Sequence, residues 1–326
     1  IEKTLDFLPE KEKKDTIKKT CQRTFQALRI DVNREFEVLY EFMEKLPGAL
    51  KPGGRVAILT FHSGEDKLVK KALKEGDFAF GVATDGDADR VGVCLDTGEW
   101  LSAQNTILLL VDYLKRVKQM PGGIVKTSSV SDKVRSIFES PQTPIYEVQV
   151  GFKYIADIMT THSIAFGGEE SGGFGYGMHI PERDGIFSSL LLLEMLSASP
   201  YCKLSDYLEE KQEKMGVICY DRIDMVYTQP DKNELLPWLY QNQPHEIAGF
   251  AIRKILPFLS SRNLVNGLKF IFEGDCRWLL IRSSETEDII RFYAEGQTGE
   301  EVATLLQYGQ NLLFKVSGSI SNLTKH

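Results

Sequence analysis

Apolar residues recur along the chain at two different spacings, and these spacings predict helices and strands. Between residues 31 and 46, apolar side chains fall three or four positions apart, as they do on one face of a helix. The following segment, LPGALKPGG, is expected to break the helix because proline and glycine interrupt regular structure. A short apolar run at 55–61 predicts a buried strand, and residues 65–74 predict another helix. The order helix, strand, helix is typical of an α/β layer.

The same alternation continues through the middle of the chain. Apolar strands are predicted on both sides of an acidic loop, and three further strands alternate with helices. This order predicts an α/β fold with a doubly wound mixed sheet. The predicted strands are 78–84, 91–95, 122–127, 144–150 and 163–168, and the predicted helices are 105–118, 130–138, 152–159 and 184–196.

The pattern changes after about residue 203. A polar helix at 204–214 and a strand at 219–228 lead into a segment that prolines interrupt. Three strands in close order and one closing helix follow, which predicts a smaller α+β domain at the C-terminal end. These strands are 267–274, 276–283 and 288–296, and the helix is 299–314.

The composition is typical of a globular protein and restricts the classes of partner to be expected. The 326 residues are 42% hydrophobic and 26% charged, with a net charge of -7. This balance disfavours nucleic-acid binding, which needs a positive surface. No apolar run is long enough to span a bilayer. The five cysteines form no CxxC pair, which suits a reducing compartment. We therefore expect a cytoplasmic protein with no membrane partner.

The segment ATDGDADRVG concentrates negative charge between two predicted strands. It places Asp85, Asp87 and Asp89 at alternate positions, with Arg90 beside them. Carboxylates about 5 Å apart repel by roughly 3 kcal/mol per pair, which a bound cation would relieve. The spacing alone allows either a solvated turn or a magnesium site at the carboxyl end of a strand. An EF-hand is excluded because Arg90 stands where that loop needs glycine.

Four segments resemble those of the α-D-phosphohexomutases, the family of phosphoglucomutase, phosphomannomutase and phosphoglucosamine mutase. DGDADR resembles the family's metal-binding loop, and VGFKYI the segment that carries an active-site lysine. GGEESGG resembles the sugar-recognition loop, and RSSETEDIIRFYAE the phosphate-binding loop of the last domain. The resemblance covers about residues 77–326. It implies transfer of a phosphoryl group between the 1- and 6-hydroxyls of a hexose phosphate, such as glucose or mannose phosphate, with Mg²⁺.

The resemblance also implies roles for individual residues. Arg90 and Lys153 would stabilise the charge of the phosphoryl group, with Lys153 also a candidate general acid. The residue types alone equally allow a surface turn at Glu169, an exposed strand position at Arg282 and a solvated helix position at Lys153. The remaining implied roles are Asp85, Asp87 and Asp89 for Mg²⁺, Glu169 and Ser171 for sugar hydroxyls, and Arg282, Ser284 and Thr286 for a phosphate.

The sequence departs from the mutase pattern in two ways. Glu285 stands where the family commonly has glycine, and Asp288 where it commonly has proline. A carboxylate there would repel a substrate phosphate unless it points away. The family's phosphorylated serine lies in a T-A-S-H-N-P-type loop, whereas here His62 and Ser63 occur in the wrong order for that loop. We therefore expect an incomplete mutase that lacks the phosphoserine domain.

The first part of the chain resembles another family. RTFQALRIDVNREFE, together with LKPGGRVAILTFHSGEDKLVKKAL, resembles the 16S ribosomal RNA cytosine-N4 methyltransferases over about residues 14–75. The glycine-rich S-adenosylmethionine loop of that family does not occur in this segment. The segment is therefore expected to serve as scaffold.

These features predict four parts and three functional hypotheses. The leading hypothesis is an incomplete phosphohexomutase-type phosphotransferase. One alternative is a fragment of an S-adenosylmethionine-dependent rRNA methyltransferase, which alone would bring a nucleic-acid partner. The other is a non-catalytic module that binds sugar phosphates. The parts are a methyltransferase-like α/β fragment at 1–76, a remnant of the second mutase domain at 77–98, a third mutase α/β domain at 99–202 and a phosphate-binding α+β domain at 203–326.

Overall fold

The computed structural model forms two compact units. Unit 1 comprises Ile1–Ala83 and Cys94–Glu99, and unit 2 comprises Thr84–Val93 and Trp100–His326. The structure describes residues 10–49, 63–260, 263–285 and 287–323, so the strand predicted at 55–61 lies outside the described residues. Among the helices of these described ranges, none combines the length and the apolar character needed to cross a lipid bilayer.

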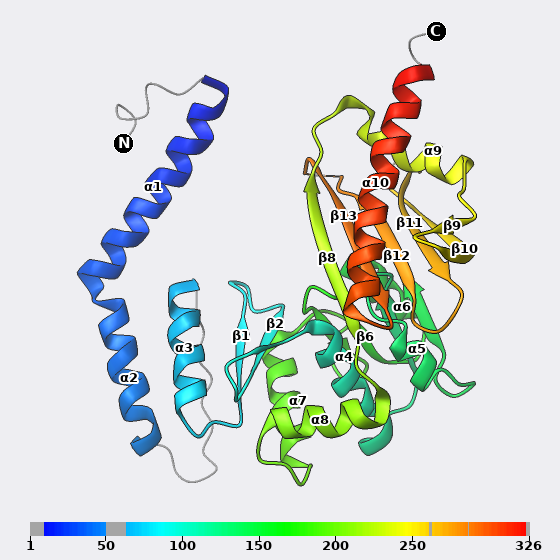
Figure 1. Ribbon diagram of the computed structural model, residues 1–326. Helices are drawn as coiled ribbons and strands as arrows, with labels where there is room; N and C mark the ends of the chain where they lie inside the picture. The colour runs from blue at the N-terminus through cyan, green and yellow to red at the C-terminus, as the bar shows by residue number, and fades with distance from the viewer. Residues whose placement is uncertain (1–9, 50–62, 261–262, 286, 324–326) are drawn as a thin grey trace. The chain divides into compact units, whose positions relative to one another are not determined.

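Unit 1 is mainly helical. The helix predicted over residues 31–46 is divided at Arg34, whose φ of 51° cannot continue a right-handed helix. The Arg29 guanidinium pairs with the Glu35 carboxylate across this break, with Nε to Oε1 at 2.8 Å. The helices are α1 (Glu10–Asn33), α2 (Glu35–Ala49) and α3 (Ser63–Glu75), drawn in blue to cyan in Figure 1.

A three-stranded sheet with the order β1-β2-β3 carries the acidic segment between its first two strands. Its strands are β1 (Phe80–Thr84), β2 (Val91–Leu95) and β3 (Trp100–Leu101). Val91, Val93 and Leu95 of β2 are buried. The acidic loop therefore starts and ends on neighbouring strands, which fixes both of its ends.

The central sheet of unit 2 confirms the predicted mixed α/β architecture. Its order is β5-β4-β6-β7, with β4 parallel to β5 and β6, and β7 antiparallel to β6. Helices cover both faces: a Cβ on Gly167 would meet Ile155 of α6, and one on Gly168 would meet Ile107 of α4. The strands are β4 (Gly123–Thr127), β5 (Ile145–Val148), β6 (Ile164–Gly168) and β7 (Phe174–Tyr176). The helices are α4 (Ala103–Asp112), α5 (Lys133–Phe138), α6 (Phe152–Thr161), α7 (Gly185–Ser197) and α8 (Leu204–Met215).

The last part of unit 2 is an antiparallel sheet with the order β8-β13-β12-β11-β10-β9, covered on one face by α9 and α10 (Figure 1). The apolar core under α10 contains Phe270, Leu279 and Phe292 from the sheet. This arrangement confirms the predicted α+β fold. The elements are β8 (Cys219–Val226), α9 (Leu235–Gln241), β9 (Glu246–Ile247), β10 (Phe250–Leu259), β11 (Val265–Phe272), β12 (Trp278–Ser283), β13 (Ile289–Gly296) and α10 (Gly299–Leu323).

The opposite face of this sheet carries a buried ionic cluster. Lys269 of β11 places its Nζ 3.1 Å from Asp132 Oδ1 and 2.9 Å from Glu147 Oε1. Lys126 of β4 contacts the same two carboxylates at 2.8 and 2.9 Å. Both lysine side chains are at most 1% exposed. Two cations thus balance two anions where the α/β and α+β parts of unit 2 meet.

The electrostatics of this cluster favour the charged forms. Burial acts to raise the pKa of Asp132, but the ammonium groups of Lys126 and Lys269 outweigh it and hold the pKa below its ordinary value. The same opposition of burial and the two lysines lowers the pKa of Glu147. The stability of the cluster therefore depends on keeping all four charges paired.

A third buried carboxylate reinforces the same junction. Glu295 of β13 accepts hydrogen bonds from the Ser131 hydroxyl, from the Asp132 N–H at 2.8 Å and from the Trp278 indole N–H at 2.5 Å. Burial raises the pKa of Glu295 despite these donors. These contacts anchor the C-terminal sheet to the loop that follows β4.

Candidate functional site

The acidic loop, residues 85–90, gathers three carboxylates at the end of β1. One oxygen from each of Asp85, Asp87 and Asp89 lies within 4.8 Å of the others. The loop turns because the Ala88 N–H bonds to the Asp85 carbonyl at 3.1 Å, and Ala88 adopts a φ of 58°. The Arg90 N–H donates to Asp85 Oδ1 at 3.2 Å. Three hard oxygen donors in this arrangement match the ligand preference of a small divalent cation.

Asp89 is the carboxylate of this loop with the least ordinary surroundings. Its Oδ2 lies 2.5 Å from Arg183 Nη2. Among the residues that the structure describes, its Oδ1 is buried without a hydrogen-bond donor, and Arg90 Nε lies 3.6 Å away. Burial raises the pKa of Asp89, with the charges of Asp85 and Asp87 adding to it and Arg183 opposing. An unsatisfied buried carboxylate oxygen facing two further carboxylates fits a metal-binding role.

The glycine-rich loop, residues 167–173, is joined to the acidic loop by its backbone. The Val91 N–H donates to the Gly172 carbonyl at 3.0 Å, and Arg90 forms an antiparallel bridge with Gly173. Gly172 has a φ of 90°, and a Cβ there would lie 2.6 Å from the Val91 carbonyl oxygen. Only glycine therefore permits this approach of the two loops.

Glu169 lies inside this arrangement rather than on the surface. The residue is 5% exposed, so the alternative of a polar surface turn does not fit. Its Oε1 accepts the Gly151 N–H at 3.0 Å, and its Oε2 lies 3.9 Å from Arg183. Burial raises the pKa of Glu169, opposed by Arg183, the Gly151 N–H and the Ser171 hydroxyl. Ser171 itself is exposed beside this carboxylate.

Lys153 lies at the start of α6, directly after the carboxyl end of β5. Parallel sheets commonly bind ligands at the carboxyl ends of their strands, and Glu169 follows β6 at the same edge. The Lys153 side chain is exposed, with its ammonium 4.6 Å from the centre of the Tyr154 ring. This position is accessible to a ligand, and it is equally that of a solvated lysine, so both interpretations of Lys153 stand.

Arg183 was not among the residues that the sequence singled out. It connects the two loops, because one guanidinium contacts both Asp89 and Glu169. It also stacks near Phe152, 5.5 Å from the ring centre. The only local signal is its place just before Asp184, whose carboxylate caps α7 by accepting the Phe187 N–H. Asp89 lies 94 positions and Glu169 14 positions earlier in the sequence, so no local pattern marks Arg183 as their shared partner.

The C-terminal arginine loop, residues 282–291, presents two arginines side by side. Arg282 of β12 is the cross-strand neighbour of Arg291 of β13. Arg291 pairs with Glu287 at 2.6 Å and with Asp224 at 3.4 Å. Within the described part of the chain, no carboxylate lies within ion-pair distance of Arg282. Arg282 is thus the more available of the two for an external anion.

Backbone and side-chain contacts position the remaining members of this loop. The Ser284 N–H donates to the Ile289 carbonyl at 3.1 Å, and the Ser284 carbonyl accepts the Lys232 ammonium at 3.0 Å. Glu285, one of the two departures from the mutase pattern, accepts a hydrogen bond from the Asn266 amide at 2.9 Å. The Asp288 side chain, the other departure, is 78% exposed and 3.9 Å from Lys232. Thr286 lies outside the described residues.

Arg222 of β8 links the glycine-rich loop to the C-terminal sheet. Its Nη1 lies 3.4 Å from Glu170 Oε1, and its Nε donates to Asp224 Oδ1 at 2.9 Å. Arg222 also lies 5.8 Å from the ring centre of Tyr293, its cross-strand neighbour. Burial raises the pKa of Glu170, against the charge of Arg222. A run of contacts therefore leads from the glycine-rich loop to the strands that carry the C-terminal arginines.

Comparison with protein families assigns different segments of the chain to two families. Residues 102–215 match phosphoglucomutase/phosphomannomutase, alpha/beta/alpha domain III, and residues 242–308 match the phosphoglucomutase/phosphomannomutase C-terminal domain. Residues 2–82 match the MraW methylase family. Both resemblances inferred from the sequence are confirmed.

Individual relatives divide in the same way. Ribosomal RNA small subunit methyltransferase H 1 of Agathobacter rectalis is 82% identical over 89 residues, which are 27% of this chain and 25% of that protein. A phosphoglucomutase/phosphomannomutase of Thermococcus kodakarensis is 26% identical over 234 residues, 72% of this chain and 47% of that protein. The chain thus spans about a quarter of the one relative and about half of the other.

The fold also matches solved structures. A Thermus thermophilus protein described as a phosphomannomutase has a TM-score of 0.58 and 27% identity, with 85% of this chain and 66% of that chain covered. The similarity therefore extends across most of the chain.

Proposed function

We propose that the chain, which carries two domains of the phosphoglucomutase/phosphomannomutase family, binds a hexose phosphate together with Mg²⁺ and supports phosphoryl transfer between the 1- and 6-positions of the sugar. Glucose or mannose phosphate is the proposed substrate. The observation that carries the proposal is the joining of two loops: three carboxylates within 4.8 Å of one another are linked through the backbone and Arg183 to a buried glutamate in a glycine-rich loop.

The residues have complementary proposed roles. Asp85, Asp87 and Asp89 would hold Mg²⁺, which would neutralise phosphate oxygens when bound. Arg90 stands beside these carboxylates and would stabilise the transferring phosphoryl group. Lys153, exposed at the same sheet edge as Glu169, would contact the phosphoryl group and donate a proton to the leaving oxygen.

Substrate contacts come from two loops. Glu169 is held by the Gly151 N–H and would accept a hydrogen bond from a sugar hydroxyl, with Ser171 beside it. Arg282 would bind the non-reacting phosphate through two parallel hydrogen bonds from its planar guanidinium. Ser284 and Thr286 belong to the same loop and would add hydroxyl donors. The Glu285 contact with Asn266 and the exposure of Asp288 give both extra carboxylates positions from which they need not face the phosphate.

Turnover would require a phosphoserine from outside these residues. The sequence contains no T-A-S-H-N-P-type loop, and Ser63 begins helix α3. We therefore propose that these 326 residues bind substrate, and that a phosphoserine-bearing partner or segment completes the reaction. The same observation favours a second candidate, a sugar-phosphate-binding module without catalysis. The five cysteines, none of them in a CxxC pair, suit action in the cytoplasm.

Titration calorimetry tests binding. The chain is expected to bind glucose 1-phosphate or glucose 1,6-bisphosphate in the presence of Mg²⁺, and to lose at least tenfold in Mg²⁺ affinity on Asp87→Asn. Asp96→Asn, in the turn after β2, is the matched control and should leave both affinities unchanged. Equal Mg²⁺ binding by wild type and Asp87→Asn would exclude the acidic loop as the metal site.

A coupled assay for glucose 6-phosphate, primed with glucose 1,6-bisphosphate, separates the candidates. Binding without turnover favours the non-catalytic module, or a reaction that needs the external phosphoserine. Robust turnover by the chain alone would show that the nucleophile lies within these residues. Calorimetry with S-adenosylmethionine tests the methyltransferase alternative, which predicts tight binding of that cofactor.

A further inference from the structure

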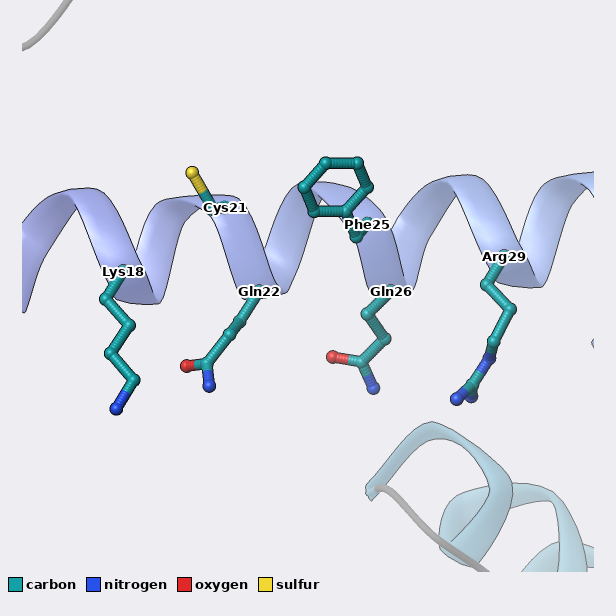
Figure 2. Close-up of a pocket in the computed structure, with 6 residues that line it drawn as sticks. All are labelled: Lys18, Cys21, Gln22, Phe25, Gln26 and Arg29. Atoms are coloured by element: carbon teal, nitrogen blue, oxygen red, sulfur yellow. The ribbon is translucent and has the colours of Figure 1, made fainter. Parts of the chain in front are cut away.

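An apolar stripe runs along one face of α1. Ile17, Cys21, Phe25, Leu28 and Val32 are spaced by four, four, three and four positions, which places them on the same side of a helix. Phe25, Leu28 and Val32 are 65%, 53% and 77% exposed. In Figure 2, Cys21 and Phe25 project to one side of α1. The polar side chains of Lys18, Gln22, Gln26 and Arg29 project to the other.

These residues do not form an enclosed site. Lys18, Cys21, Gln22, Phe25, Gln26 and Arg29 line a shallow hollow, and all of them belong to α1 (Figure 2). A hollow built from a single helix lacks the converging walls of a small-molecule pocket. An exposed apolar stripe with a polar flank is instead typical of a surface that another protein segment covers.

The similarity of this segment to part of a longer protein points to one occupant of the stripe. The matching region is 82% identical to a methyltransferase H chain yet spans only 25% of it. Because so few residues differ, we expect this face of α1 to keep the chemistry that it has in the relative. That relative is about four times as long as the matching region. In such a protein these side chains would face the other three quarters, which the matching region does not include. A second copy of this chain would instead have to complement a face that was shaped against different residues.

We propose that the α1 stripe is a docking surface for the remaining three quarters of a methyltransferase H chain. In this complex, α1 supplies the missing helix, and Phe25, Leu28 and Val32 become buried in the methyltransferase body. The proposal does not depend on the phosphohexomutase assignment. It concerns a segment of the sequence that the proposed sugar-phosphate site does not use.

The test uses the full 326-residue chain and the Agathobacter rectalis methyltransferase H 1 from which the 89 matching residues have been removed. The two are mixed, and the dissociation constant is measured by calorimetry. Leu28→Asp and Phe25→Asp are each expected to weaken binding about tenfold or more, because each removes a buried apolar contact. Arg23→Asp lies on the opposite face of α1 and should leave the affinity unchanged. Equal affinity for all three variants would overturn the proposal.

A second measurement covers the case in which the truncated methyltransferase folds poorly alone. The truncated protein is joined to the chain through a flexible linker, and hydrogen exchange is followed along α1. The amides from Phe25 to Val32 should be protected in the fusion, and Leu28→Asp should remove this protection. A fusion that leaves α1 as unprotected as in the free chain would refute the proposal. So would a homodimer of the free chain that Leu28→Asp dissociates.

Discussion

Replacing Lys269 with methionine tests whether charge balance holds the buried ionic cluster together. The substitution keeps an unbranched side chain of similar length and removes one of two ammonium groups. Asp132 and Glu147 would then share Lys126 alone, leaving a net negative charge at a position where the replaced side chain is 0% exposed. The variant therefore isolates the charge from the packing.

The expected cost follows from the geometry. Each ion pair of Lys269, at 2.9 and 3.1 Å, is worth roughly 5 kcal/mol at an effective dielectric of about 20. Methionine carries no charge that must be desolvated on folding, so the variant recovers part of the lost ion-pair energy. Removal of one partner from a buried pair typically costs about 3–5 kcal/mol, and we expect Lys269→Met to fall in that range.

Equilibrium urea unfolding measures this free energy. Trp278 provides a local fluorescence signal, because the Lys269 ammonium lies 4.5 Å from its ring centre. Lys254→Met, at an exposed position on the neighbouring strand β10, is the matched control and should change stability by less than about 0.5 kcal/mol. The double variant Lys269→Met/Glu147→Gln restores neutrality, so it should cost less than the sum of its two single variants.

Two results would refute this reasoning. A cost for Lys269→Met as small as that of Lys254→Met would show that the cluster contributes no net stability. Strict additivity in the double variant would show that the two charges do not interact. Either outcome would leave the apolar core under α10 as the main support of the C-terminal sheet.

Three further predictions concern pH, the loop junction and the metal site. Because the folded-state pKa values of Asp132 and Glu147 lie below their ordinary values of 3.8 and 4.5, their contribution to stability is present above about pH 4.5. It is lost as pH falls through the folded-state values, and urea midpoints at a series of pH values should show a slope that Asp132→Asn reduces. Gly172→Ala should lose about 1–3 kcal/mol in urea unfolding, because its φ of 90° and the backbone contact at 2.6 Å both exclude a Cβ. Gly86→Ala, with open space around it, should change little, and equal effects would contradict the loop geometry. Asp87→Asn should raise the melting temperature without divalent ions by relieving repulsion, and should reduce the rise that Mg²⁺ produces. A lowered metal-free melting temperature would show that Asp87 has a structural role.

Most of the fold follows from the periodicity of the sequence, and the exceptions have local causes. Strand β10 was not predicted, because Pro257 interrupts its pattern. Within the described residues, β9 pairs with β10 at Phe250 and Ala251, so Pro257 lies beyond that pairing on the outer strand, where a missing N–H costs little. The division between α1 and α2 was also missed, since Arg34 adopts a left-handed conformation that its residue type rarely takes.

The candidate site was predictable where its residues follow one another in the chain. The acidic loop and the glycine-rich loop are continuous motifs: the first was identified from its spacing and its resemblance, the second from its resemblance alone. The contacts of Arg183 with Asp89 and of Arg222 with Glu170 span 94 and 52 positions, so no local pattern marks these two arginines. The same holds for Lys126 and Lys269, since the contact between Lys269 and Asp132 joins positions 137 residues apart along the chain. Charge complementarity at such distances becomes visible only in three dimensions.

The backbone junction of the two loops restricts how this protein can evolve. The acidic loop is fixed on one side where the Val91 N–H meets the Gly172 carbonyl, and on the other where the Gly185 N–H meets the Ala88 carbonyl at 2.9 Å. Insertion or deletion of a single amino acid between these points would shift one attachment relative to the other. Natural variation in ligand preference should therefore arise by exchange of side chains at constant loop length, and the two loops should be inherited together as one block.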